Sequence, residues 1–255
     1  MIQKIIAIGG GEIGRPKEGG GFYPVQTSSI DKEIIKLSEK QKPKLLFLPT
    51  ASNDSKGYAS VVENYFGKKL GCEVSSLFLK KEKYTILEIE QKILSSDIIY
   101  VGGGNTLKMM RVWKKLGVDK ILQKARERGI VLSGLSAGAI CWFKQGNSDS
   151  RKFKNPKADF IKINCLNFLP ALFCPHYDKE KDRPLSLKKM MKKTTGVAIA
   201  LDNCAALEVV NEKVRLISSK ISANGYKIFW SKGKYYKEKL IRNKWFMFSD
   251  LVKKG

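Results

Sequence analysis

Short apolar runs alternate with amphipathic segments through the first half of the chain, and this alternation is what most limits its fold. The apolar runs cover residues 4–10, 44–52, 73–79, 97–104 and 130–135. The amphipathic segments, typical of helices, cover 29–40, 58–71, 85–96, 105–117 and 118–129. Strands that are apolar along their whole length need cover on both faces. The alternation therefore predicts an α/β fold with a mostly parallel central sheet flanked by helices.

The pattern changes after about residue 195. The later apolar stretches, such as GVAIAL, AALEVV and KVRLISS, are shorter and follow one another without helical segments between them. They predict a β-rich C-terminal extension with hairpins over about 196–245. No linker rich in proline or serine separates this region from the rest of the chain. We expect residues 1–255 to form a single domain.

The composition argues against several classes of protein. The chain has no run of about eighteen apolar residues, so no transmembrane helix is expected. Its first residues turn glycine-rich and do not form a secretory signal, which makes the cytoplasm the expected location. The five cysteines form no C-x-x-C pair and there is a single histidine, so we expect neither a disulfide framework nor a metal site.

The net charge of the chain is +24, from 48 basic and 24 acidic residues. A balance of this kind can indicate nucleic-acid or membrane binding. Here the basic residues are spread along the whole chain, and no arginine-rich arm or RNA-binding signature is present. Scattered charge is typical of a solvated surface, so we expect neither a specific nucleic-acid partner nor a membrane partner.

The glycines at positions 9, 11 and 14 match the dinucleotide-binding pattern G-x-G-x-x-G. The segment that follows holds Pro16, Pro24 and three consecutive glycines, so it cannot form the helix that such a site requires. We therefore expect no nicotinamide or flavin cofactor. The glycines instead predict a flexible loop at the carboxyl edge of the sheet, where open α/β folds bind ligands.

The stretch GIVLSGLSAGAICWF contains G-x-S-x-G around Ser136, between an apolar strand and a run that favours a helix. A nucleophile elbow needs this layout, because the flanking glycines allow the sharp turn that exposes the serine hydroxyl. The N–H group of Ala137 would then point toward a developing oxyanion. The sequence predicts Ser136 as a nucleophile at the start of the next helix.

A serine hydroxyl needs a base, and His176 is the only histidine in the chain. It follows the apolar run FLPALFC, which should place it at the carboxyl end of a strand, on the same sheet edge as Ser136. A second oxyanion donor is expected from the glycine-rich turn YVGGGNT, with Gly104 favoured and Gly103 as the alternative. Asn105 in that turn would cap the following helix, alongside any role in binding substrate.

These motifs, in the order YVGGGNTLKMM, SGLSAGAICWF, GNSDS, FCPHYD and AIALDNCAALEVV, resemble the peptidase E-like serine peptidases, which include aspartyl dipeptidases and cyanophycinases. The resemblance covers nearly the whole chain. It implies a flavodoxin-like fold related to class I glutamine amidotransferase domains. It also implies a Ser–His–acid site that hydrolyses short peptides through an acyl-enzyme, without a metal or organic cofactor.

The acidic member of such a site is open in this sequence. The resemblance places Asn203 where relatives carry the glutamate that orients the histidine, and an amide stabilises an imidazolium less than a carboxylate does. We favour the neighbouring Asp202 as the acid. Asp178 and Asp149 are further candidates for the acid or for substrate binding.

The sequence thus predicts a serine peptidase for short peptides, with dipeptides that begin with aspartate as one candidate substrate. Two alternatives stay open: another amide or ester hydrolase that uses the same serine, and a catalytically degenerate basic binding protein on the same fold. Arg151, Lys152, Lys179 and Arg183 lie near the motifs and could supply a cation for an acidic substrate. The sequence does not decide between a monomer and a homodimer.

Overall fold

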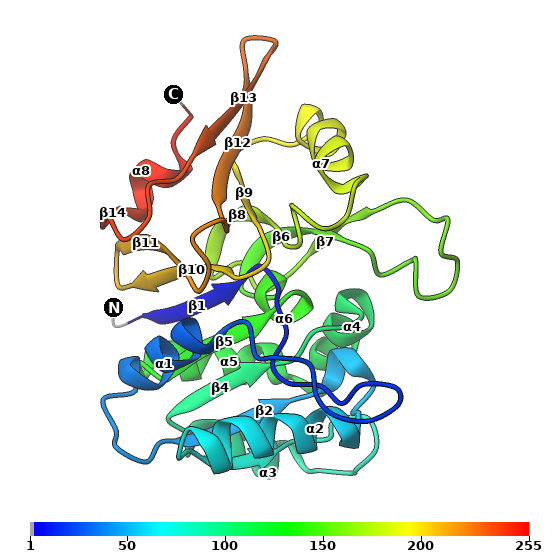
Figure 1. Cartoon of the computed structure of the whole chain (residues 1–255), viewed down its shortest axis with the longest axis vertical. Helices are drawn as coiled ribbons and strands as arrows, with labels where there is room; N and C mark the ends of the chain where they lie inside the picture. Colours follow the sequence, from blue (N-terminus) through cyan, green and yellow to red (C-terminus); the bar gives the residue numbers. More distant parts are fainter. Residues whose placement is uncertain (1–2, 255) are drawn as a thin grey trace.

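The computed structural model describes residues 3–254. Its first half alternates strands and helices as the sequence predicts (Figure 1). The elements are β1 (Lys4–Ile8), α1 (Ser28–Leu37), β2 (Lys44–Leu48), the 3₁₀ turn Thr50–Ser52, α2 (Lys56–Val62) with its π-helical continuation Glu63–Lys69, β3 (Glu73–Ser76), α3 (Ile86–Leu94), β4 (Ile98–Val101), α4 (Thr106–Leu116), α5 (Val118–Glu127) and β5 (Val131–Leu135).

The second half is richer in strands. It contains α6 (Ala137–Ile140), β6 (Phe143–Ser148), β7 (Ile161–Asn164), β8 (Leu169–Cys174), α7 (Arg183–Lys192), β9 (Ala198–Leu201), β10 (Ala205–Val210), β11 (Lys213–Ser218), β12 (Gly225–Ser231), β13 (Lys234–Lys239), β14 (Phe246–Met247) and α8 (Phe248–Val252). No helix among residues 3–254 is both long enough and apolar enough to cross a membrane.

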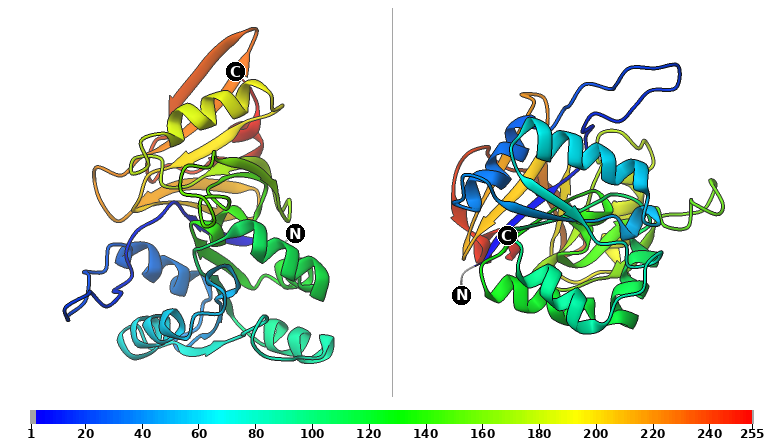
Figure 2. Two further views of the ribbon diagram at one scale, coloured as in Figure 1. Left: turned by 90° about the vertical axis from the view of Figure 1, so that its right-hand side faces the viewer. Right: turned by 90° about the horizontal axis from the view of Figure 1, so that it is seen from below.

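The first sheet has eight strands in the order β14-β11-β10-β1-β5-β4-β2-β3. Strands β1 to β5 pair in parallel, and β10, β11 and β14 extend the sheet with antiparallel pairs. Side chains of α1 and α2 pack on one face of the parallel strands, and those of α3, α4 and α5 pack on the other. This layered arrangement, visible in Figure 2, confirms the predicted α/β fold with helices on both faces.

A second sheet of six strands, in the order β13-β12-β9-β8-β6-β7, lies above the first in Figure 1. Its central strands β6, β8 and β9 are parallel, and α7 covers one of its faces through Leu187 and Met191. The C-terminal strands predicted from the sequence are present, but they divide between the sheets: β10 and β11 join the first, and β9, β12 and β13 join the second.

The helix expected after Ser136 is only one turn long, because the chain enters β6 at Phe143. Tertiary packing explains this difference. The Phe143 ring stacks on Phe173 of β8 with a centroid separation of 4.5 Å, and the Trp142 ring stacks on Phe168 at 6.0 Å. Burial of these rings between β6 and β8 outweighs the local helix preference of the segment.

Candidate active site

Ser136 lies in a strained turn between β5 and α6. Its backbone angles are φ 57° and ψ −111°, a conformation that residues with a side chain rarely adopt. The Ser136 N–H donates to the carbonyl oxygen of Ile8, which ties the turn to the end of β1. This geometry is that of a nucleophile elbow, in which the turn presents the serine hydroxyl beyond the end of its strand.

The two glycines of the G-x-S-x-G motif allow α6 to approach the sheet closely. A Cβ atom at Gly134 would overlap the carbonyl group of Gly138, and a Cβ atom at Gly138 would overlap that of Val101 in β4. Only hydrogen fits at either position. The glycines therefore permit the turn by removing bulk between β5, α6 and β4, as the sequence pattern suggests.

His176 contacts the serine directly. Its Nε2 atom lies 2.8 Å from Ser136 Oγ, a hydrogen-bond distance. His176 follows the carboxyl end of β8, but β8 belongs to the second sheet, so the expectation that the histidine and the serine share one sheet edge is wrong. The candidate site lies where the ends of the two sheets meet. The carboxyl end of β5 in the first sheet and that of β8 in the second bring the pair together.

Asn203 contacts the opposite side of the imidazole. Its Oδ1 atom lies 2.7 Å from His176 Nδ1. An amide oxygen only accepts, so the ring proton lies on Nδ1 and Nε2 accepts from the Ser136 hydroxyl. The Asn203 backbone N–H donates to Asp178 Oδ1 at 2.8 Å. Asp178 thus holds the asparagine in place without contacting the ring.

Asp202, the residue favoured from the sequence, does not contact His176. Its buried carboxylate accepts from the backbone N–H of Asn224 at 2.9 Å, on the other side of the turn from Asn203. Asp149 has no direct contact with the imidazole either, although its charge interacts with that of His176. Burial raises the pKa of Asp149, and the nearby charge of Arg183 partly offsets this effect.

The surroundings of His176 favour its neutral form. Burial lowers the pKa of His176 below its usual value, the hydrogen bond to Asn203 raises it in part, and the positive charge of Arg183 lowers it again. A neutral imidazole is the form that can accept the serine proton. The depressed pKa keeps His176 in this form at neutral pH.

The glycine-rich loop after β1 supports the histidine. The backbone N–H of His176 donates to the carbonyl oxygen of Gly9, and the backbone N–H of Cys204 donates to that of Gly10. A Cβ atom at Gly10 would overlap both Asn203 Oδ1 and His176 Nδ1. Sequence reasoning read these glycines as part of a flexible ligand loop and missed this close packing. Gly10, the middle one of three consecutive glycines, is left unexplained by the dinucleotide pattern and is the signal that could have shown it.

A cavity of about 560 Å³ opens beside the serine, and Ser136, His176, Gly103 and Gly104 are among its lining residues. The Gly103 N–H donates to the hydroxyl of Tyr58 at 3.4 Å. Gly104 needs to be glycine, because its φ is 138° and a Cβ atom would overlap the Ala51 carbonyl. Both predicted oxyanion donors from this turn therefore border the same cavity as the serine.

Two other residues of the predicted set adjoin this region. Ala137 is the first residue of α6, where backbone N–H groups have no partner within the helix. Asn105 caps α4: its Oδ1 accepts from the Lys108 N–H at 3.0 Å, and its Nδ2 donates to the Ser150 carbonyl at 2.9 Å. Asn105 thus fixes the turn that carries Gly103 and Gly104.

A cation that the sequence reasoning missed lines the cavity. Arg15 borders the space beside Ser136 and His176. Its Nε atom donates to Glu12 Oε2 at 2.7 Å, and the other oxygen of Glu12 accepts from three backbone N–H groups of residues 13–15. Burial raises the pKa of Glu12, but hydrogen bonds from Arg15 and Ile13 lower it overall, so the pair is charged.

None of the four cations considered from the sequence, Arg151, Lys152, Lys179 and Arg183, is among the lining residues of the cavities beside Ser136. Arg183 is buried and donates to the Asn147 carbonyl and to Glu180. Lys152 borders a different cavity, and Lys179 lies beside Asp178. Closeness in sequence to a motif therefore does not identify the cation that lines the cavity. The loop after β1 folds back over the site, and this contact is long-range.

Comparisons with known proteins identify the family of this chain. The family model "Peptidase family S51" matches residues 19–217. The chain is 36% identical to an uncharacterised peptidase, YgaJ, of Bacillus subtilis over 229 residues, which cover 89% of this chain and 92% of the relative. It is 29% identical to a peptidase E of Shewanella denitrificans over 147 residues, which cover 57% of this chain and 58% of the relative.

The fold is similar to the crystal structure of a peptidase from an acI-B1 Actinobacterium. The TM-score is 0.71 at 18% identity, and the match covers 97% of both chains. The family match extends from the loop after β1 to β11 and so includes the serine, the histidine and the asparagine of the candidate site. The chain therefore belongs to peptidase family S51 and is a peptidase E-like, serine-type peptidase.

Proposed function

We propose that this peptidase cleaves short peptides through an acyl-enzyme formed on Ser136. The hydrogen bond between Ser136 Oγ and His176 Nε2 is the single observation that carries the proposal. As Ser136 Oγ attacks the peptide carbonyl, His176 Nε2 takes the hydroxyl proton. The imidazolium then protonates the leaving amine as the C–N bond breaks. A water molecule then attacks the acyl-enzyme while His176 Nε2 takes its proton. The imidazolium returns this proton to Ser136 Oγ as the acyl group leaves.

The remaining residues have supporting roles in this proposal. The N–H groups of Ala137 and of Gly104, with Gly103 as the alternative, stabilise the oxyanion of the tetrahedral intermediate. Asn203 holds His176 in the tautomer that accepts from serine, and Asp178 holds Asn203. The site uses an amide where a Ser–His–acid site has a carboxylate.

The proposed substrates are short peptides with an acidic group, and dipeptides that begin with aspartate are one case. The support is Arg15, which lines the cavity beside Ser136 and has only one of its five guanidinium N–H groups in a hydrogen bond with a described residue. A guanidinium pairs well with a carboxylate. Arg15 would thus contact the carboxylate of the bound peptide.

Ser136→Ala tests the catalytic proposal. Removal of the nucleophile should lower kcat for a cleaved dipeptide by a factor of about 10⁴ or more. The measurement is hydrolysis of aspartyl dipeptides, followed by release of free amine. A fluorophosphonate probe should label the wild-type protein at Ser136 and leave the variant unlabelled. Hydrolysis at the wild-type rate by the variant would refute the proposal.

Arg15→Gln tests the substrate proposal separately. We compare kcat/KM for a peptide with aspartate and for the same peptide with asparagine. The wild type should prefer the acidic peptide, and the variant should lose about tenfold of that preference while fluorophosphonate labelling is unchanged. An unchanged preference in the variant would reject Arg15 as the determinant and leave the role of Ser136 standing.

A further inference from the structure

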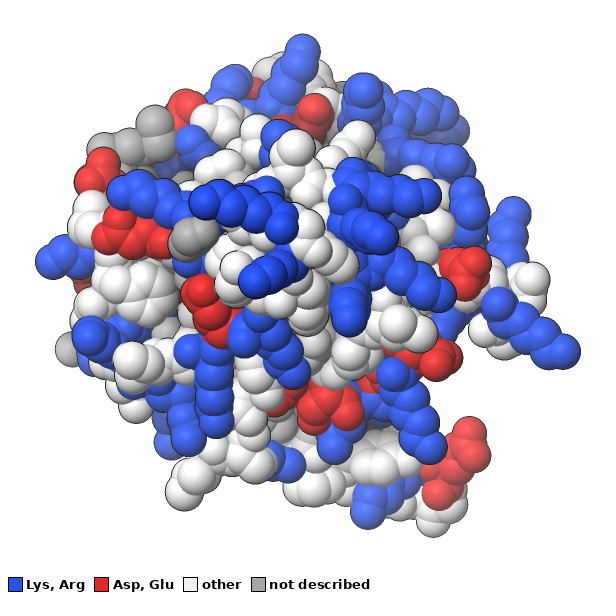
Figure 3. Space-filling view, turned by 90° about the horizontal axis from the view of Figure 1, so that it is seen from above, with Lys and Arg blue, Asp and Glu red and all other residues white. Residues whose placement is uncertain are grey.

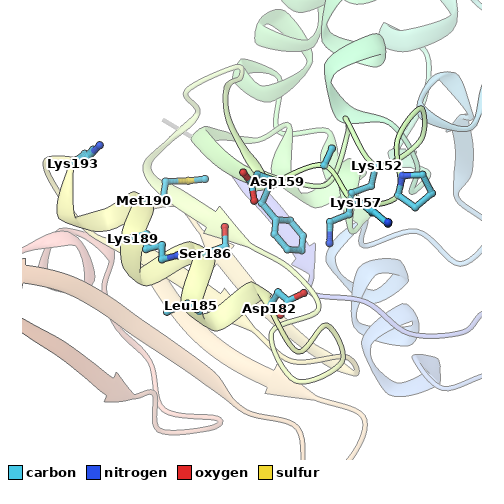
Figure 4. A pocket seen from close by; sticks show the side chains of 12 residues that line it. Lys152, Lys157, Asp159, Asp182, Leu185, Ser186, Lys189, Met190 and Lys193 are labelled. Carbon is cyan, nitrogen blue, oxygen red and sulfur yellow. The ribbon is translucent and has the colours of Figure 1, made fainter.

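A second cavity, of about 590 Å³, lies between the loop 152–160 and helix α7 (Figure 4). Its lining shares no residue with the cavities beside Ser136. The volume is in the range typical of ligand sites. Because the proposed peptidase mechanism uses none of these residues, this cavity is free for a separate function.

The lining carries an excess of positive charge. Lys152 and Lys157 come from the loop, Lys189 and Lys193 come from α7 and its C-terminal end, and the acidic residues are Asp159 and Asp182. Figure 4 shows the loop lysines on one side of the cavity and the α7 lysines on the other. Within residues 3–254, none of these four lysines forms a salt bridge. Their charges are therefore available to an anionic ligand.

The region between the lysines is partly apolar. Phe160, Leu185 and Met190 contribute to it, and Leu185 is 56% exposed although it is apolar. The Ser186 hydroxyl accepts from Asn147 Nδ2 at 3.2 Å, which leaves its own proton able to point toward a ligand. The cavity thus combines cations on two sides with an apolar middle.

The floor of the cavity is firmly held. The Phe160 ring is buried, with Lys152 Nζ 3.9 Å and Arg183 Cζ 4.6 Å from its centroid. Arg183 is itself buried and is fixed by its hydrogen bonds to Asn147 and Glu180. A preorganised floor lowers the cost of ordering the site when a ligand binds.

We propose that this cavity binds a peptide segment that carries acidic residues on both sides of an apolar residue. The acidic side chains pair with Lys152 and Lys157 on one side and with Lys189 and Lys193 on the other. The apolar side chain contacts Leu185 and Met190. The site acts as a docking site for acidic peptide chains, apart from the point of cleavage.

The lining favours a peptide over a nucleic acid. Asp159 and Asp182 would repel a continuous phosphate backbone, whereas they can accept hydrogen bonds from peptide N–H groups. The aromatic ring of the cavity, Phe160, is only 9% exposed and so offers no open platform on which bases could stack. The cations are confined to two sides and do not form a continuous track.

The test uses isothermal titration calorimetry of the peptide acetyl-Glu-Glu-Leu-Glu-Glu-amide into the Ser136→Ala protein, so that no cleavage occurs. The double variants Lys152→Gln/Lys157→Gln and Lys189→Gln/Lys193→Gln should each weaken binding about tenfold. The matched control is Lys114→Gln/Lys115→Gln, an exposed pair in the last turn of α4. It removes the same charge away from the cavity and should change binding less than about twofold.

Three results would overturn the proposal. The first is no binding, or an equal loss of binding in the control variant, which would assign the effect to overall charge. The second is equal binding of the neutral peptide acetyl-Gln-Gln-Leu-Gln-Gln-amide. The third is displacement by a single-stranded oligothymidine that binds more tightly than the peptide and depends on the same lysines. Replacement of the central leucine by serine should weaken binding, which checks the apolar contact.

Discussion

At the scale of single residues, the asparagine beside His176, the proposed base, decides the expected pH dependence. His176 must be neutral to act as a base, so activity is lost as the pH falls through its pKa. Burial lowers that pKa, which places the acid limb of the wild-type profile below that of an ordinary histidine. Asn203→Asp adds a carboxylate at Nδ1, and the limb of kcat/KM should move to higher pH by about one to two units.

Asp202→Asn is the control for this prediction. The Asp202 carboxylate is bonded to the Asn224 N–H and not to the histidine, so the pH profile of this variant should match the wild type. Profiles of kcat/KM between pH 4.5 and 9, measured for Asn203→Asp and for Asp202→Asn, test the prediction and its control. A shifted limb in Asp202→Asn, with none in Asn203→Asp, would mean that the histidine partner is assigned wrongly.

These residues also show which contacts of the candidate site can be predicted from the sequence. The contact between Ser136 and His176 could be predicted, because each motif places its residue at a strand end and the chain has one histidine. The partner at Nδ1 could not, because Asp202 and Asn203 are adjacent and the turn sends their side chains to opposite sides. In that turn Cys204 has a positive φ of 67° and its backbone N–H donates to the Gly10 carbonyl, a long-range contact that no local pattern indicates. Arg15 was missed for a similar reason, since a long-range loop contact places it.

At the scale of secondary structure elements, the packing of α6 against β4 holds the elbow. Gly138→Ala would put a methyl group against the carbonyl of Val101, and α6 would have to move. We expect the free energy of unfolding to fall by about 2 to 3 kcal/mol, and kcat to fall with it, because Ser136 and the Ala137 N–H shift together. Urea denaturation followed by circular dichroism measures the first effect.

Gly57→Ala is the matched control for the packing argument. Gly57 lies in α2, and the nearest atom to an added Cβ would be Ser55 Oγ at 3.9 Å. Alanine favours helices, so the free energy of unfolding should stay constant or rise by up to about 1 kcal/mol. Equal destabilisation by both substitutions would show that the close contact of Gly138 is not the cause.

The elements differ in how well the sequence predicts them. The strands and helices from β1 to β5 match the expected segments, because apolar strands and amphipathic helices have distinct periods. The second sheet was not foreseen. Its strands β6, β8 and β9 are as long as those of the first sheet, so strand length does not indicate a separate sheet. Only tertiary packing, such as Phe143 on Phe173, shows that they leave the first sheet.

At the scale of the whole molecule, positive charge dominates the surface. Figure 3 shows a face on which lysine and arginine side chains far outnumber acidic ones. The net charge of +24 adds to the local positive charge of Arg15, which lines the cavity beside Ser136. A field of this sign attracts anionic peptides before they touch the site, and salt screens it over about 10 Å at 0.1 M ionic strength.

This field predicts different salt dependences for acidic and neutral substrates. Between about 20 and 300 mM salt, kcat/KM for an aspartate-containing peptide should fall about threefold or more, and that of the matched asparagine peptide should stay nearly constant. The value of kcat should change little for either peptide, because salt weakens the encounter and leaves the chemistry of the bound complex intact. Stopped assays at five salt concentrations separate the two constants. Parallel falls for both peptides would point to a salt effect on the protein itself, and the attraction of acidic substrates by the net charge would then have no support.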